Sequence, residues 1–150
     1  MEYRMPTGIS GESDESIIYL PYYISRTFIQ KHKQWTFIFG NDYYRKGCLG
    51  QAWEFAQEEN TIAIPTCNKL CPSSSTKYWQ DGMYLTVIPY FESAFADALK
   101  RGKPIIPCRK IGEGCSRLKE MSPNLFRYMH KRLDEIKYSS IQYTQDITKL

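Results

Sequence analysis

The sequence predicts a single α/β domain in which short strands alternate with helices. Compact apolar segments of strand length recur along the chain, and apolar residues at helical spacing lie between them. Size supports one domain, because 150 residues with 42% hydrophobic side chains are enough for one core and too few for two. We expect residues 16–150 to form this domain, and residues 1–15, rich in Gly, Ser and acids, to be a flexible lead-in.

The first half of the chain predicts a β-α-β unit preceded by a strand and a short helix. Residues 17–24 are β-branched and aromatic enough for a strand, and residues 25–33 favour a helix. The apolar segments 35–39 and 61–65 are expected to be strands, joined by a helix over 47–59.

The next section runs from a Ser-, Cys- and Pro-rich loop at 66–82 to a strand at 103–107. Pro89 is expected at the start of the intervening helix, and Gly102 just past its end. The apolar face of this helix is predicted to consist of Phe91, Ala94, Phe95, Ala98 and Leu99.

The last helix has the clearest signals. Ser122 is a typical N-cap residue, Pro123 suits the first helical position, and apolar residues continue at helical spacing to Lys137. Residues 139–147 alternate loosely between apolar and polar, which predicts an edge strand.

Charge narrows the function. The net charge is +4, and the positive excess lies in residues 101–150, which carry 11 basic and 5 acidic side chains. Such a balance fits a local anion site, weak nucleic-acid affinity or a solvated basic helix face. It is too small for a general DNA-binding protein, so nucleic acid is not expected as the main partner.

Cysteine content and hydropathy indicate a reduced, cytoplasmic protein that does not span a membrane. The five cysteines are an odd number, and the start of the chain has no secretory apolar core. The longest apolar stretch, 17–24, is interrupted by Pro21, whereas a membrane helix needs about 20 residues.

Two glycine-bearing loops carry the candidate chemistry, because each follows an expected strand and precedes an expected helix. Ligands of open α/β sheets bind at this edge, beyond the carboxyl ends of the strands. The first loop spans 40–52 and offers Asn41, Asp42 and Gln51 to hydroxyl groups or a water; the second spans 107–118 and places Gly112 and Gly114 among basic side chains. An ordinary turn is the alternative for each loop.

Several other enzyme classes lack their motifs. The chain has no Gly-x-Gly-x-x-Gly or Walker A pattern, no Gly-x-Ser-x-Gly elbow, and no Arg six residues after a cysteine. Cys67 and Cys71 could hold zinc with a third ligand, but their spacing is atypical, so neither a metal nor a cofactor is expected.

Further residues allow two interpretations. Tyr78, Trp79, Tyr84 and Tyr90 could stack on an adenine or pack within their own loop. His130 is expected to be packed or at the surface rather than catalytic.

Taken together, the loops resemble a family of small bacteriophage accessory proteins, of the T-even-like kind, that are related to macro domains. The resemblance covers about residues 35–137. It rests on Phe37-Ile-Phe-Gly-Asn-Asp, Arg45, Gly47, Gly50-Gln-Ala52, Ile62-Ala-Ile-Pro-Thr66, Gly102-Lys-Pro-Ile-Ile-Pro107 and Ile111-Gly-x-Gly114 with Leu118, against a family pattern of roughly FGDN…RG.GGQA…IPT…P..GIGTG.A.L.

The chain departs from this pattern at three places. Asn41 and Asp42 invert the usual Asp-Asn order, Cys67 replaces a Lys, and Glu113 stands where a small Thr is usual. A carboxylate at position 113 is expected to point to solvent, since it would otherwise repel a phosphate.

The resemblance implies a three-layer α/β/α sandwich with a mixed central sheet, which binds ADP-ribose. Asp42 and Asn41 would be the catalytic residues at the distal ribose. Arg109, Lys110 and Arg117 would surround the diphosphate. The ligand-binding residues would be Gly40, Gly47, Gly50, Gln51, Ile111, Gly112, Gly114, Cys115, Ser116 and Arg117.

The function expected from this site is hydrolysis of an ADP-ribose derivative by metal-independent attack of water. The reaction would remove the phosphate of ADP-ribose 1″-phosphate or cleave an ADP-ribosyl bond. Because the same parts make a receptor, the alternative is a non-catalytic protein that sequesters an ADP-ribose-type signal of host defence. A weaker alternative is a binder of nucleic acid or of a host protein through the basic region 101–137.

Overall fold

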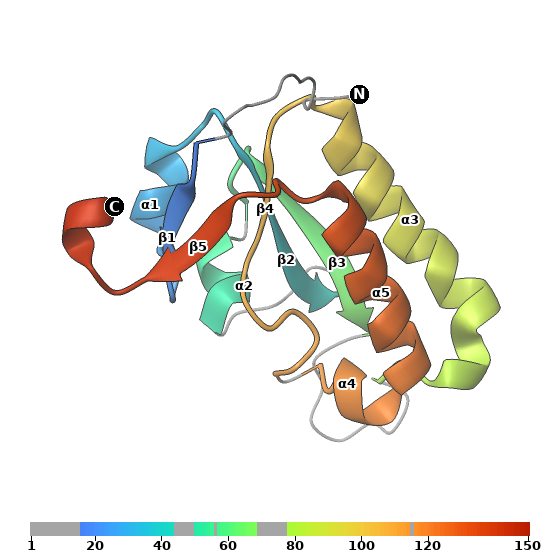
Figure 1. Ribbon diagram of the computed structural model, residues 1–150. Helices are drawn as coiled ribbons and strands as arrows, with labels where there is room; N and C mark the ends of the chain where they lie inside the picture. The colour runs from blue at the N-terminus through green and yellow to red at the C-terminus, as the bar shows by residue number, and fades with distance from the viewer. Residues whose placement is uncertain (1–15, 44–49, 56, 69–77, 115) are drawn as a thin grey trace.

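The computed structural model describes residues 16–43, 50–55, 57–68, 78–114 and 116–150, with the side chains of Gln51 and Trp53 left out. The chain is a mixed α/β protein with two small parallel sheets, as Figure 1 shows. One sheet has three strands in the order β3-β2-β4, and the other pairs β1 with β5. All strand pairs among the described residues are parallel, so the mixed sheet that we expected is not found there.

The N-terminal strand and helix lie close to their predicted positions. Strand β1 (Ile18–Pro21) is shorter than expected and ends at its proline. Helix α1 (Arg26–Lys31) begins after Ser25, whose Oγ accepts a hydrogen bond from the Phe28 N–H at 3.1 Å. Serine is a typical N-cap residue, because its side-chain oxygen accepts a hydrogen bond from a backbone N–H of the first helical turn.

Strand β2 (Thr36–Asp42) is the centre of the three-stranded sheet, between β3 (Thr61–Cys67) and β4 (Ile105–Pro107). Both its neighbours run parallel to it, and therefore all three carboxyl ends lie at one edge. Helix α2 (Gly50–Phe55) connects β2 with β3 and is shorter than predicted. The Phe55 ring packs against the Phe37 and Phe39 rings, with 6.0 and 4.9 Å between ring centroids. Helix α2 therefore lies on the face of β2 that carries these odd-numbered residues.

Helix α3 (Tyr84–Lys100) corrects two predictions. It begins directly after a 3-10 turn, η2 (Asp81–Met83), so Pro89 lies inside the helix and not at its start. The loss of one backbone hydrogen bond at Pro89 is tolerated because the flanking Val87 and Phe91 are fully buried. Leu99, expected on the apolar face, is 45% exposed.

The C-terminal part contains α4 (Leu118–Met121), α5 (Pro123–Ile136), β5 (Ile141–Thr144) and a 3-10 turn, η3 (Ile147–Lys149). Ser122 precedes α5 as predicted, but its hydroxyl donates to the Trp79 carbonyl instead of capping the helix. Asp81 caps it from η2: one carboxylate oxygen accepts from the N–H groups of Asn124 and Leu125, both at 3.1 Å. Local sequence patterns could not identify this capping residue, since it lies more than 40 positions away.

The helices divide between two sides of the strands. Phe28 of α1 and Phe55 of α2 both contact Phe37, whereas α3 packs on β3 and against α5. Figure 1 shows α3 and α5 together on the side away from α1 and α2. Within the described part of the chain, none of the helices combines the length and apolar character needed to cross a bilayer.

Candidate functional site

The carboxyl end of β2 holds the two residues expected to be catalytic. Asn41 and Asp42 are adjacent and buried, at 5% and 1% exposure. The Asn41 Oδ1 accepts a hydrogen bond from the Asp42 N–H at 2.8 Å, and the Thr66 hydroxyl donates to the Asn41 carbonyl at 3.3 Å. The pairing with β3 shifts register between Asn41 and Asp42. Such an irregularity re-aims side chains at the end of a strand, and functional residues are often found beside one.

Asn41 and Asp42 line a cleft of about 850 Å³. The cleft runs along β3 and is bounded by one side of α3. Its described lining includes the carboxylates of Asp42, Glu58 and Asp97 and a single cation, Arg101. Carboxylates attract hydroxyl and amino groups and repel phosphates, so the lining favours a sugar or a base over a diphosphate.

Aromatic rings border the same cleft. Tyr43 and Tyr90 both line it, with their ring centroids 4.8 Å apart. Trp79 packs against both rings, with its ring centroid 5.9 Å from that of Tyr90, and its Nε1–H donates to the Pro65 carbonyl at 2.7 Å. Of the four aromatic residues that allowed two interpretations, Trp79 therefore packs within the protein, whereas Tyr90 is available to the cleft.

The loop after β4 is the expected diphosphate loop, and glycine is needed there for two reasons. Gly112 has a φ of +86°, which favours a residue without a side chain. A Cβ atom at Gly112 would also lie 3.2 Å from the Phe126 ring and 3.3 Å from Leu118. Gly114, by contrast, has open space where its Cβ would be. Gly112 thus serves close packing against α4 and α5 as well as the loop conformation.

The loop after β4 meets β2 next to the Asn41–Asp42 pair. The Cys108 N–H donates to the Ile38 carbonyl at 2.9 Å, and a Cβ atom at Gly40 would lie 3.2 Å from the Ile111 side chain. The chain leaves β2 toward α2 and leaves β4 toward α4 and α5, on the other side of the strands. Neighbouring parallel strands whose connections depart to opposite faces form the topological switch point at which α/β sheets bind ligands.

The basic residues of this loop are used differently from what the sequence predicted. The Arg109 guanidinium lies 4.5 Å from the Tyr22 ring centroid and 5.9 Å from that of Tyr143. Arg117 forms an ion pair with Glu120 at 3.1 Å. Both guanidinium groups therefore contact protein side chains, which the sequence did not predict. The loop also offers an anion its backbone N–H groups and the exposed Lys110.

Glu113 is exposed and pairs with Lys119 at 3.6 Å, which agrees with the expectation that it points to solvent. Ser116 is half-buried, and Gly50 and Gln51 begin α2. Gly47 and Cys115 lie outside the described residues.

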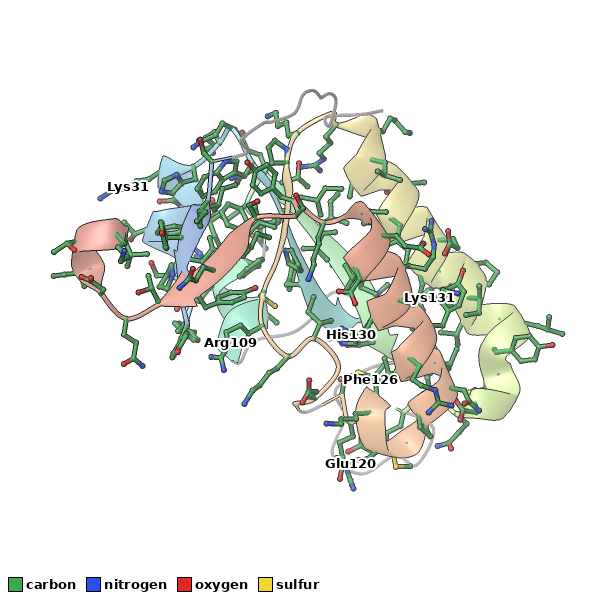
Figure 2. The ribbon with its side chains drawn as sticks, viewed as in Figure 1. Lys31, Arg109, Glu120, Phe126, His130 and Lys131 are labelled. Atoms are coloured by element: carbon green, nitrogen blue, oxygen red, sulfur yellow. The ribbon has the colours of Figure 1, made fainter. Side chains whose placement is uncertain are left out.

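His130 contacts the loop from α5, a role that the sequence did not reveal. Its Nε2 lies 2.8 Å from the Ile111 carbonyl oxygen, and its ring packs on Phe126 with 4.4 Å between the ring centroids. Figure 2 shows Arg109 and His130 on opposite sides of this loop. Helical spacing could place His130 beside the apolar stripe, but it could not name a backbone carbonyl 19 residues away as its partner.

Cysteine and metal chemistry receive little support from the described residues. Cys108 is buried, and burial raises the pKa of its thiol to about 12, so the reactive thiolate is scarce at neutral pH. Within the described ranges no three His, Cys, Asp or Glu side chains gather closely enough to hold a metal ion. Cys71, the proposed zinc partner of Cys67, lies outside those ranges.

Comparison with known proteins places the chain in a family without assigning a role. The sequence profile of the family of unknown function DUF7831 matches residues 20–132, which include both loops. No curated protein and no solved structure matches the chain.

Proposed function

The chain belongs to the DUF7831 family of unknown function, and from its site we propose that it binds and hydrolyses an ADP-ribose derivative. The observation that carries the proposal is the buried Asn41–Asp42 pair, which lies at the switch point of parallel strands and lines a cleft of about 850 Å³. A cleft of this volume is large enough for a nucleotide-sized ligand.

The surroundings of the pair suggest how the ligand is oriented. The acid-rich cleft with Tyr43 and Tyr90 suits a ribose and a base, and the backbone N–H groups of the loop after β4 suit the diphosphate. The distal ribose would then lie against Asn41 and Asp42. In this arrangement each part of the ligand meets groups of complementary polarity.

We also propose that the helices and strands form a three-layer α/β/α sandwich related to macro domains. Its support is the division of the helices, with α1 and α2 on one side of parallel strands and α3 and α5 on the other. The likeness to small bacteriophage accessory proteins extends the proposal to a role against host defence in the host cytoplasm.

Between the two reactions considered, the cleft favours cleavage of an ADP-ribosyl bond over removal of a 1″-phosphate. Glycosidic cleavage builds positive charge at the anomeric carbon, which the carboxylate of Asp42 would stabilise. A terminal phosphate beside the same carboxylate would be repelled. The preference for ADP-ribosyl substrates follows from this difference in charge.

In the proposed reaction Asp42 accepts a proton from a water molecule as the water oxygen bonds to the anomeric carbon. The bond from that carbon to the leaving group breaks, and the proton that Asp42 accepted passes through solvent to the leaving group, which restores the Asp42 carboxylate. The products are ADP-ribose and the protonated leaving group. The Asn41 Oδ1 accepts a hydrogen bond from the Asp42 backbone N–H and so helps to hold the Asp42 carboxylate in position.

Asp42→Asn tests the assignment with little change in side-chain shape. We expect turnover of an ADP-ribosylated peptide to fall at least about 100-fold, the contribution typical of a general base, while ADP-ribose affinity changes little. Asp97→Asn, at the exposed rim of the same cleft, is the matched control and should retain most of the activity. Equal activity in the wild type and Asp42→Asn would overturn the role of Asp42. Faster release of phosphate from ADP-ribose 1″-phosphate than of ADP-ribose from the peptide would overturn the substrate preference.

A receptor without turnover is the second candidate, and the burial of Asp42 favours it. A carboxylate with 1% exposure can accept a hydrogen bond from a ribose hydroxyl as readily as it can activate a water. ADP-ribose binding combined with no product from either substrate would establish the receptor.

A further inference from the structure

We propose that His130 is a positioning residue for the loop after β4. It selects one of two orientations of the peptide between Ile111 and Gly112, and so determines which way the Gly112 N–H points. The inference rests on the proposed function, in which this loop binds a diphosphate, and it adds a residue that contacts no ligand itself.

The peptide in question is the centre of a β-turn. The Glu113 N–H donates to the Lys110 carbonyl at 3.1 Å, which closes the turn around Ile111 and Gly112. Gly112 has a φ of +86°, and Ile111 is not among the residues with positive φ. A negative φ followed by a positive φ at the two central positions defines a type II turn.

Type I and type II turns differ mainly by a rotation of the central peptide through roughly 180°, which leaves the α-carbons almost in place. The Ile111 side chain packs near Gly40, and Gly112 packs near Leu118 and Phe126. These contacts fix where the turn lies, but they do not distinguish its two peptide orientations. Because glycine accepts both signs of φ, residue 112 does not decide the orientation either.

The hydrogen bond from His130 does distinguish them. Its Nε2 lies 2.8 Å from the Ile111 carbonyl oxygen, which can only accept, so Nε2 carries the proton and donates. The Phe126 ring, 4.4 Å away, holds the imidazole in place. The contact is available only while the carbonyl points toward α5.

The orientation of the N–H follows from the geometry of the peptide. No peptide bond among the described residues is cis, and in a trans peptide the C=O and N–H point in opposite directions. With the Ile111 carbonyl toward α5, the Gly112 N–H points away from α5, the side on which the proposed function places the diphosphate. In the rotated peptide a phosphate would meet a carbonyl oxygen and be repelled.

Three substitutions separate this role from simple packing. His130→Leu keeps an apolar neighbour for Phe126 and removes the donor. His130→Gln restores a donor, because its amide nitrogen is as many bonds from the α-carbon as Nε2 is. Met129→Ala, a fully buried neighbour on α5, is a control for lost stability.

The first measurement is made on the ligand-free full chain. A strong nuclear Overhauser effect between the Ile111 Hα and the Gly112 amide proton marks the type II turn. We expect it in the wild type, in His130→Gln and in Met129→Ala, and we expect it to weaken in His130→Leu. If the leucine variant does not fold, His130→Asn takes its place, because its amide is too short to reach the carbonyl. A strong effect in the donor-free variant overturns the role of His130, whether or not ADP-ribose binds.

The second measurement is the affinity for ADP-ribose. We expect His130→Leu to bind about tenfold more weakly and His130→Gln to bind within about threefold of the wild type, as for the loss and return of one well-placed hydrogen bond. Equal weakening in Met129→Ala would show that the effect comes from stability and would overturn the proposal. If the wild type itself does not bind ADP-ribose, the proposed function fails while the ligand-free measurement still decides the role of His130.

Discussion

The packing contact between α3 and α5 and the carboxyl edge of the three-stranded sheet both contain half-buried or buried charge, but they use it differently. Between the helices, Arg132 donates to the Glu92 carboxylate at 2.8 and 3.1 Å and to Glu135 at 2.7 Å, and the Tyr128 hydroxyl donates to Glu92. At the sheet edge, Asp42 lines a cleft beside Asn41. The helix charges lie in contact with one another, whereas Asp42 lies in the lining of a cleft large enough for a ligand.

The difference explains what the excess of basic side chains in residues 101–150 contacts. Arg132 and Lys137 of the last third pair with acids on α3 and α5, and Arg117 pairs with Glu120. Part of the basic excess in the last third is thus used in surface ion pairs and in helix packing. Substitutions between α3 and α5 should therefore change stability alone, and substitutions at the edge should change binding.

The largest effect is expected for Gly112→Ala, which lies where the edge and the helices meet. A positive φ disfavours alanine by about 1–2 kcal/mol, and the close approach of Phe126 and Leu118 adds strain, so we expect a loss of about 2 kcal/mol in the free energy of unfolding. ADP-ribose affinity should fall as well. Urea denaturation and calorimetry measure the two effects.

Gly114→Ala is the control for this prediction, since the residue has open space and no positive φ. It should change the free energy of unfolding by less than about 0.5 kcal/mol. Comparable losses in the two variants would mean that Gly112 has no special conformational role.

A smaller effect, on stability only, is expected for Glu92→Gln. Removing the charge that Arg132 contacts should lower the free energy of unfolding by about 1 kcal/mol at pH 7, after allowance for solvent at this partly exposed pair. ADP-ribose binding should be unchanged. Glu120→Gln, in an exposed ion pair with Arg117, should have almost no effect on stability.

The pH dependence sharpens the same test. The hydrogen bond from Arg132 lowers the pKa of Glu92 below its ordinary value of 4.5. A carboxyl group with a lowered folded-state pKa stabilises the protein above the unfolded pKa and loses that contribution as pH falls. The stability difference between wild type and Glu92→Gln should be full at pH 7 and shrink below about pH 4.5. A difference that does not change with pH would refute the ionic origin of the effect.

The smallest effect is expected for Arg109→Ala. Its guanidinium packs on the exposed Tyr22 ring, a contact worth about 0.5–1 kcal/mol, and it takes no part in the proposed anion site. Thermal unfolding should show the modest loss of stability, and ADP-ribose affinity should stay within about twofold of the wild type. A tenfold loss of affinity would return Arg109 to the diphosphate site that the sequence predicted.

The sequence predicted those features that depend on local patterning. Residues 36–39 and 61–65 of the predicted apolar segments lie within strands, and Leu125, Met129, Leu133 and Ile136 of the last helix are buried. The position of Asn41 and Asp42 after an apolar strand was enough to predict that both lie at the carboxyl end of a strand. Each of these follows from residues close together in the chain.

The features that were missed depend on distant contacts. Capping of α5 by Asp81 and anchoring of Ile111 by His130 both join segments that periodicity cannot relate. Pro89 was misplaced because the signal for a helix start is local, whereas the burial of Val87 and Phe91 that sustains the helix around it is tertiary. The partners of Arg109 and Arg117 could not be predicted for the same reason, since they lie just after β1, on β5 and on α4.

The central claim, that the carboxyl edge is a nucleotide site, is tested most directly by titrating the full chain with ADP-ribose in a calorimeter. The account predicts saturable one-to-one binding with a Kd below about 100 μM, retained in Glu92→Gln and weakened in Gly112→Ala. Absence of binding at ligand concentrations up to about 1 mM, with the chain folded, would contradict it.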